Sequence, residues 1–305
     1  MIAFLEFFTD YKSTFTFGLI YGLFALSTYA SLASGVLSVA AASFGAVGGF
    51  TYARIRLDHD LGLGLGLLIG IGVGMATAII LSFVLLRLAS HYVAMATIAL
   101  VLITRVFIVN LPDLTGGANG ISVPRQSSLW SVLAVTAVSL FIFWRLANSR
   151  YGMAAVTVRE DPQAASTLGV DPRHVQRIGL LLSGGIGGVA GVLMADQLQF
   201  IGPNTFYIDL AFTMLAAVVL GGAYHWFGAI VGAMVFRFLP ELLSEFIDDG
   251  HEIANGILLV IIMIYLPRGI VDPRRRKQRE RPLWPPSRRS SSGPAIDEQP
   301  EAVLS

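Results

Sequence analysis

The sequence predicts an all-α membrane protein that crosses the bilayer several times. Only 13% of the 305 residues are charged and 54% are hydrophobic, whereas a soluble domain carries about 25% charged residues. The mean hydropathy is +0.69. Apolar runs of about 20 residues, the length that a helix needs to cross the hydrocarbon core, recur along the chain, and the weaker alternating pattern of membrane strands is missing.

The apolar runs predict about eight or nine membrane segments. They occupy residues 14–33, 61–86, 88–109, 128–147, 177–196, 208–223, 226–246 and 252–268. The stretch from Gly35 to Arg54 also has a membrane-like composition, but Gly45, Gly48 and Gly49 make it a poor continuous helix. It is either a full span, which places the N-terminus outside, or a broken, re-entrant segment, which places it inside.

Three regions are expected: an N-terminal segment at 1–13, a transmembrane domain at 14–271 and a tail at 272–305. The tail is basic and rich in Pro and Ser, a composition that cannot bury a core, so we expect it to be disordered. No cleavable signal peptide is predicted, because Glu6 and Asp10 precede the first apolar run and a basic n-region is missing.

The distribution of positive charge predicts the orientation. Fifteen Lys and Arg residues fall on the face that holds loop 149–177 and the tail, and four fall on the opposite face. Loops on the cytoplasmic side of a membrane protein carry the excess of Lys and Arg. We therefore expect this loop and the C-terminus to be cytoplasmic.

The loop from Ser149 to Arg177 is a long polar stretch in an otherwise apolar chain, and it predicts a short helix. Asp161 can cap the start of that helix, Pro162 suits its first turn, and Gly169 can end it. Ala164, Ala165 and Leu168 are expected on one side. A helix of this kind suits docking to another protein better than it suits a tight turn.

Glycines recur at the spacing that is typical of close helix contacts. Small residues four positions apart lie on one stripe of a helix and let a neighbouring backbone approach. We expect helix packing at Gly62, Gly66, Gly70, Gly74, Gly184, Gly188, Gly228 and Gly232.

The order of several motifs resembles one family of transporters. Gln163-Ala164-Ala165-x-x-x-Gly169 is similar to the EAA loop of ABC importer permeases, with Gln in place of the leading acid. The stretches GMAAVTVREDPQAASTLGVDPRHVQRIGLLLSGGIGGVAGVLMA, Ile201-Gly202-Pro203, VVLGGAYHWFGAIVGA and Leu266-Pro267-Arg268-Gly269-Ile270 resemble the branched-chain amino acid ABC permeases. The forms REDxxAAxxLGV and HYVAMATIAL…LTGGANGI favour the LivM-type subunit over its LivH-type partner. Ala223-Tyr224-His225-Trp226 departs from the Gly and Ser that the family usually has there.

The resemblance implies a permease of the type II ABC importer kind, in the bacterial inner membrane. Such a subunit forms half of the translocation path for branched-chain or related amino acids and alternates between inward-open and outward-open states. Its implied partners are a second, LivH-type permease, two cytoplasmic ABC ATPases, an external substrate-binding protein and membrane lipids, with no nucleic acid. The chain has no GxxxxGK[ST] motif, so we expect no enzyme activity and no bound cofactor, with ATP hydrolysed by the partner subunits. Contact with the ATPases is expected at Arg159, Glu160, Asp161, Gln163, Ala164, Ala165, Leu168 and Gly169.

A Gly-rich loop is expected on the external side. Bare backbone amides of such a loop can bind a carboxylate, although glycines also simply permit tight turns. The resemblance favours a role in the substrate path or an external gate for Thr115, Gly116, Gly117, Asn119 and Gly120. Cysteine is absent and the histidines are scattered, so no metal site is predicted.

Three alternatives remain open. The chain is a permease for urea or amides of the same family, or a proton-coupled secondary transporter that uses Asp196, since a carboxylate inside the membrane is functional by default. A solvated position near the interface would equally explain Asp196. The third alternative is an intramembrane serine protease, with Ser43 or Ser183 beside His91 or His225, although neither serine carries a nucleophile motif. Arg105 is expected either to snorkel toward the interface or to pair with a carboxylate such as Asp113 or Asp209, a structural role that is favoured over binding a ligand.

Overall fold

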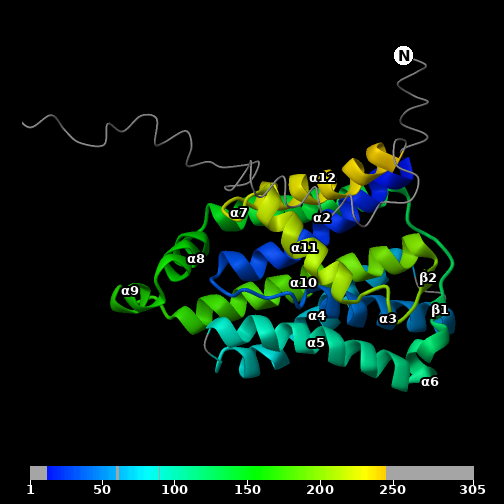
Figure 1. Ribbon diagram of the computed structural model, residues 1–305, viewed down its shortest axis with the longest axis horizontal. Coiled ribbons are helices and arrows are strands. Elements are labelled where there is room, and N and C mark those ends of the chain that lie inside the picture. The colour runs from blue at the N-terminus through cyan, green and yellow to red at the C-terminus, as the bar shows by residue number, and fades with distance from the viewer. Residues whose placement is uncertain (1–11, 60–61, 89, 245–305) are drawn as a thin grey trace, which may run out of the picture. The chain divides into compact units, whose positions relative to one another are not determined.

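Long helices run side by side through the part of the chain that the computed structural model describes, residues 12–59, 62–88 and 90–244 (Figure 1). The chain divides into two units, Met1–Asp272 and Pro273–Ser305, and the described residues all belong to the first. The predicted span at 252–268 and the predicted tail lie outside them. The helices are α2 Lys12–Ala33, α3 Ala41–His59, α4 Leu63–Leu85, α5 Ser90–Asn110, α6 Pro112–Thr115, α7 Leu129–Ala147, α8 Arg150–Glu160, α9 Pro162–Thr167, α10 Pro172–Leu198, α11 Ile208–Gly221 and α12 Trp226–Ser244, with a 3-10 turn η1 at Gly117–Asn119.

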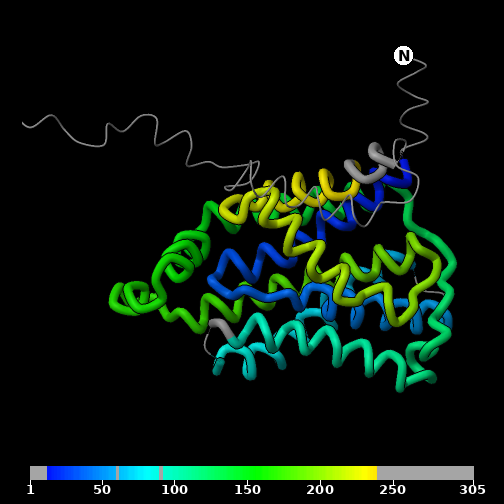
Figure 2. The backbone as a smooth tube through the Cα atoms, viewed as in Figure 1, coloured from blue at the N-terminus to red at the C-terminus, as the bar shows by residue number. Residues whose placement is uncertain are grey.

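The bundle has two distinct ends. At one of them the short strands β1 (Ile121–Ser122) and β2 (Phe200–Ile201) pair antiparallel, with Ile121 opposite Ile201, beside α6. At the other lie α8 and α9, as the backbone tube in Figure 2 also shows. We call these the β1–β2 end and the α8–α9 end.

Five of the described helices are long and apolar enough to span a membrane: α2, α4, α5, α7 and α10. The helices α11 and α12 pass the same test only as a pair, and they are bent by 119° at their junction. Helix boundaries agree with the predicted runs to within a few residues, and side-chain caps explain several of them. Ser128 and Ser131 form a capping box at the start of α7, and the Asp171 carboxylate accepts from the Arg173 amide, at 2.9 Å, before Pro172 opens α10.

The stretch from Gly35 to Arg54 crosses the bundle with an unwound first part. A Cβ on Gly35 would lie 3.3 Å from Arg159, at the α8–α9 end. Helix α3 begins only at Ala41 and reaches the β1–β2 end. In between, the Val39 amide donates to Thr97 Oγ1 of α5, at 3.3 Å. This bond satisfies a backbone donor that a helix would otherwise satisfy. The described helices that are long and apolar enough to span a membrane do not include α3, so the full span and the re-entrant segment both stay predictions.

Helix α10 lies at the centre of the bundle and meets its neighbours through glycines. Gly184 lies against Gly74 of α4, Gly188 against Gly70, and Gly191 against Gly45 of α3. In each pair the backbone carbonyl of one glycine occupies the place where a Cβ of the other would be, so any larger residue would push the helices apart.

The remaining predicted glycines divide into two groups. Gly66 faces the Tyr52 ring, Gly228 packs against Gly221, and Gly232 against Ala217. The prediction is wrong for Gly62, because within the described residues nothing lies within 4 Å of the position that its Cβ would take. Gly62 precedes the first turn of α4, before that helix has reached α3 and α10.

Two groups of three helices, α2–α3–α4 and α10–α11–α12, have the same order along the chain. In each group a non-helical segment separates the first helix from the second. The two groups run in opposite directions: α2 ends at the α8–α9 end, and α10 begins there. Helix α4 packs on α10, and α12 packs on α2, where Gly22 meets Ile230. The helices α2 and α10 cross at Ser27, whose hydroxyl donates to the Ser183 carbonyl at 2.7 Å. Inverted repeats with broken helices are typical of transporters.

Candidate functional site

The polar loop forms two helices, α8 and α9, rather than the single short helix that was predicted between Asp161 and Gly169. Arg159 and Glu160 end α8, and Asp161 then caps α9: its carboxylate accepts from the amides of Gln163, at 2.8 Å, and Ala164, at 3.1 Å. The Asp161 cap and the Pro162 start were predicted, as was the end at Gly169, which has a φ of +79°. The sequence prediction missed α8, which starts at the Ser149 cap.

The residues that α8 and α9 bury and expose differ from the prediction. Ala165 is fully buried in a small apolar cluster with Ala155, Val158 and Val175. Leu168 is 74% exposed, and Gln163 and Ala164 are also exposed. Ala164, Ala165 and Leu168 therefore do not share one side, because neighbouring helical positions are about 100° apart. Leu168 joins Met153 and Val156 of α8 as exposed apolar side chains at this end.

Arg159 connects α8 to the junction of α11 and α12. Its Nη1 donates to the Ala223 carbonyl at 2.6 Å, and its guanidinium lies 4.4 Å from the centre of the Tyr224 ring. Tyr224 belongs to the tetrapeptide that departs from the family pattern. Arg159 thus holds the turn between α11 and α12 from within this chain.

The Gly-rich loop at the β1–β2 end is built by specific backbone geometry. Thr115 Oγ1 donates to the carbonyls of Ile108, at 2.5 Å, and Leu111, at 2.8 Å. Gly116, Gly117 and Gly120 have positive φ, which favours glycine, and a Cβ on Gly120 would lie 2.5 Å from the Ile201 carbonyl oxygen. Asn119 is exposed. The loop is thereby fitted against β2.

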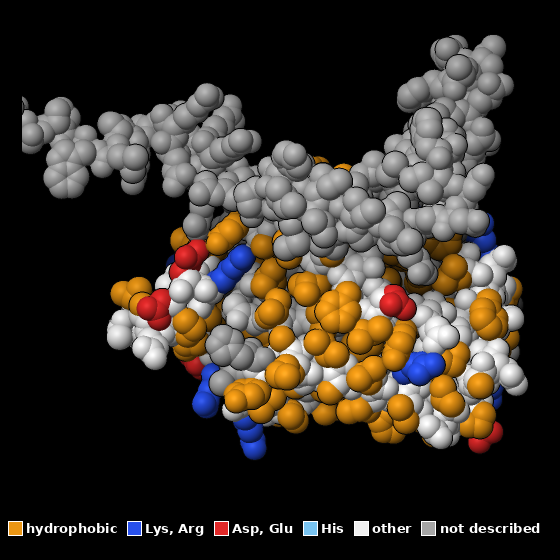
Figure 3. All heavy atoms as spheres, in the orientation of Figure 1, with side chains coloured by type: hydrophobic (Ala, Val, Ile, Leu, Met, Phe, Trp, Pro, Cys, Tyr) orange, Lys and Arg blue, Asp and Glu red, His pale blue; other side chains and the backbone are white. Residues whose placement is uncertain are grey.

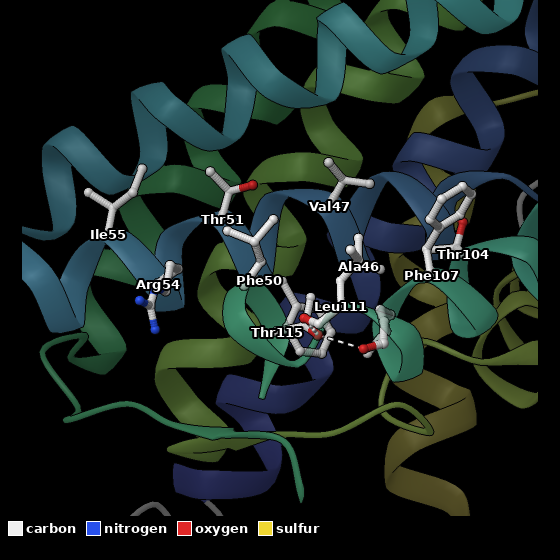
Figure 4. A pocket seen from close by; sticks show the side chains of 12 residues that line it. Ala46, Val47, Phe50, Thr51, Arg54, Ile55, Thr104, Phe107, Leu111 and Thr115 are labelled. Carbon is white, nitrogen blue, oxygen red and sulfur yellow. Dashed lines mark hydrogen bonds between the residues drawn. The ribbon is translucent and has the colours of Figure 1, made fainter. Parts of the chain in front are cut away.

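A cavity of about 440 Å³ opens between α3, α5 and α6. Figure 4 shows Ala46, Phe50 and Arg54 of α3 on one side of it and Phe107, Leu111 and Thr115 on the other. Of the residues predicted for the substrate path, Thr115 lines this cavity. The lining is mostly apolar, with hydroxyls from Thr51, Thr104 and Thr115.

Asp196 is fully buried, which excludes the solvated position considered above. Its carboxylate accepts from the Tyr52 hydroxyl at 2.8 Å, from the Ser127 amide at 2.6 Å and hydroxyl, and from the Gln126 amide at 3.1 Å. Gln197 donates to the Ser127 hydroxyl at 2.8 Å. These bonds join α10, α3 and the segment before α7, so the Asp196 carboxylate stabilises the packing of these three parts of the chain.

The serine protease alternative gains no support. The Ser183 hydroxyl lies 3.2 Å from that of Ser27, and in the described part of the chain no hydrogen bond joins Ser43 or Ser183 to a histidine. The side chain of His91, the other histidine named for this alternative, lies outside the described part of the structure. Among the described residues, no group of three His, Asp or Glu side chains could hold a metal ion.

Arg105 does not pair with Asp113 or Asp209 in the described structure. Its Nε donates to the Asn204 side-chain oxygen at 3.1 Å, and its guanidinium lies 4.7 Å from the centre of the Tyr207 ring. The predicted ion pair is therefore wrong. Both contacts come from the non-helical segment before α11.

Comparisons with known proteins agree with this picture of a helical permease. The family model described as "Branched-chain amino acid transport system / permease component" matches residues 11–266. The chain is 28% identical over 301 residues to the high-affinity branched-chain amino acid transport system permease protein LivM of Escherichia coli (strain K12), covering 87% of this chain and 68% of that one. It is 30% identical over 149 residues to LivH of the same organism, covering 48% and 47%. It is also 28% identical over 155 residues to the nucleoside ABC transporter permease protein NupC of Lactococcus lactis, covering 48% of each. No solved structure matches the chain.

Proposed function

Because the chain belongs to the family of branched-chain amino acid transport permease components and is of the LivM type, we propose that it is one half of the translocation path of an ATP-driven importer for branched-chain or related amino acids. Its partners would be a LivH-type permease in the membrane, two ATPases in the cytoplasm and a substrate-binding protein outside. Relatives of both permease types support the pairing of two subunits.

The observation that carries the proposal is the apolar surface at the α8–α9 end. Met153, Val156 and Leu168 are 66%, 56% and 74% exposed there, on helices that are capped and therefore ordered. The excess of Lys and Arg supports a cytoplasmic position for this end. Exposed apolar side chains outside the bilayer are typical of a protein interface, and the ATPases are the partners that a permease meets on this side.

The proton-coupled alternative loses its main support, because the oxygens of Asp196 are occupied by donors from within the chain. In this proposal Asp196 holds the fold, and transport depends on ATP alone.

A substitution at Leu168 tests the proposed ATPase contact. In the co-expressed complex, Leu168→Glu should reduce the amount of ATPase that co-purifies with the permeases, because it buries a charge in the interface. Leu114→Glu, on a leucine that is 56% exposed at the opposite end, is the matched control and should retain the ATPases. The contact is rejected if Leu168→Glu retains both the ATPases and ATP-dependent uptake.

Uptake into proteoliposomes tests the substrate class. The complete importer with its binding protein should accumulate labelled leucine when ATP is inside and not when only a pH gradient is imposed. Accumulation of urea but not leucine would assign the chain to urea or amide transport instead.

A further inference from the structure

Arg105 lies on α5, on a face that is otherwise apolar. It is exposed, as are Leu102 and Val109, which are three and four residues away and share its side of the helix. The guanidinium is held by the Asn204 side-chain oxygen, 3.1 Å from Nε, and lies over the Tyr207 ring. Arg105 therefore has a fixed position next to the first turn of α11.

The first turn of α11 lies deep in the bundle. The Phe206 ring, just before it, is buried and lies 6.2 Å from the ring centre of Phe24 and 6.2 Å from that of Phe50. Phe24 is near the middle of the 22-residue α2. The chain from Gln199 to Tyr207 thus descends from the β1–β2 end as a non-helical segment before α11 begins. Broken helices of this kind mark binding sites in transporters.

Asp209 presents a carboxylate on the first turn of α11. It is exposed, and in residues 12–59, 62–88 and 90–244 its carboxylate forms no hydrogen bond or ion pair. Phe212, one turn further on and 48% exposed, lies on the same side of the helix. Figure 3 shows hydrophobic side chains over this face, with acidic and basic side chains set among them.

A positive and a negative side chain that remain apart on an apolar face are unfavourable if that face meets lipid. Each charge in the middle of a membrane helix costs about 2.5–3.5 kcal/mol, and an ion pair between Arg105 and Asp209 would reduce that cost. The side chain of Arg105 is instead tied to Asn204 and Tyr207, which leaves both charges available to a third molecule.

We propose that Arg105 and Asp209 bind the head group of an amino acid as it passes through the permease, the guanidinium binding its carboxylate and Asp209 its ammonium group. A zwitterion supplies both opposite charges within one small molecule. Leu102 and Val109, on the side of α5 that carries Arg105, and Phe212, one turn after Asp209 on α11, are exposed apolar side chains that could contact an aliphatic side chain. Asn204 and Tyr207 are positioning residues for Arg105. This site rests on the proposed function, which requires such a substrate.

The test uses the complete importer in proteoliposomes, with labelled leucine. Arg105→Gln and Asp209→Asn should each lower leucine uptake about tenfold or more, because each removes a charge-assisted contact. ATP hydrolysis stimulated by the binding protein should persist, so that less leucine is carried per ATP. Arg105→Lys, which keeps the charge but loses the planar fork, should restore part of the uptake. Asp113→Asn, on an exposed carboxylate of α6, is the matched control and should transport as the wild type does.

Three results would overturn the site. In the first, Arg105→Gln and Asp209→Asn carry leucine at the wild-type rate. In the second, both variants lose the second permease during purification, which would mean that the charges join the two subunits. In the third, uptake and ATP hydrolysis fall together, which would indicate a general defect. Wild-type importer that carries no leucine would instead reject the proposed function, and the site with it.

Discussion

The Tyr52 hydroxyl donates a hydrogen bond to the buried Asp196 carboxylate, at 2.8 Å, and so joins α3 to α10 near the β1–β2 end. The same carboxylate accepts the amides of Gln126 and Ser127. Asp196→Asn should lower the free energy of unfolding by about 2–3 kcal/mol, because an amide nitrogen would face donors that need an acceptor. Thermal unfolding in detergent measures this. Tyr52→Phe, which removes one donor only, should have a smaller effect, and equal stability of all three proteins would contradict the described network.

Two glycines of α4 give opposite predictions for the same substitution. A Cβ on Gly70 would lie 2.6 Å from Val192 Cγ2 and 3.0 Å from the Gly188 oxygen, whereas one on Gly72 meets nothing within 4 Å among the described residues. Gly70→Ala should destabilise the protein by about 1–3 kcal/mol. Gly72→Ala should be neutral or stabilise it by up to about 1 kcal/mol, since alanine favours a helix. Denaturation midpoints compare them directly, and a ranking in the other order would place the α4–α10 contact elsewhere.

The cap of α9 should matter for the ATPase contact. Asp161→Ala removes the acceptor of the Gln163 and Ala164 amides and should cost the helix about 0.5–2 kcal/mol. We expect weaker retention of the ATPases, which quantitative co-purification measures. Asp161→Asn keeps a capping side chain and should behave as the wild type; loss of the ATPases in both variants would mean that the charge, rather than the cap, is required.

Arg159 should stabilise the turn between α11 and α12. Arg159→Ala removes a charged hydrogen bond to Ala223 and the contact with Tyr224, so the free energy of unfolding should fall by about 1.5–3 kcal/mol. Arg173→Ala, on an exposed arginine of the same region, should change it by less than about 0.5 kcal/mol. Thermal shift assays distinguish the two, and an equal effect would contradict the described bond.

The buried phenol of Tyr151 should make the folded protein less stable at alkaline pH. Burial raises the pKa of the Tyr151 phenol above its usual value near 10, so the folded protein keeps the proton longer than the unfolded chain does. The stabilisation is complete below pH 10 and is lost as the pH rises above it, because the unfolded state is then favoured by ionisation. Tyr151→Phe should reduce the slope of stability against pH between about 10 and 11.5. An unchanged slope would show that Tyr151 does not contribute.

Much of the helix pattern could be predicted from the sequence, because long apolar runs and capping residues are local signals. The capping role of Asp161 and the stop at Gly169 follow from residue type and spacing alone. The break at residues 36–40 could only be suspected, since its backbone is satisfied by Thr97, which is far away in the sequence.

The environment of the charged residues could not be predicted. Asp196 depends on donors about 70 and 144 residues away, and nothing in its neighbours indicates them. Arg105 was expected to meet a carboxylate because charge suggests an ion pair, whereas the structure gives it an amide oxygen and an aromatic ring. The exposure of Met153 and Val156 could not be predicted, because the sequence prediction missed helix α8.

The glycine contacts of α10 bring its backbone directly against α3 and α4, close enough for Cα–H groups to approach carbonyl oxygens of the neighbouring helix. Side chains border these contacts: Val192 of α10 lies over Gly70 of α4, and Phe44 of α3 lies over Gly187. The central helix, which begins beside α9 and ends at the Asp196 network, is therefore held in register with both neighbours, and a shift along its axis would have to rearrange these side chains.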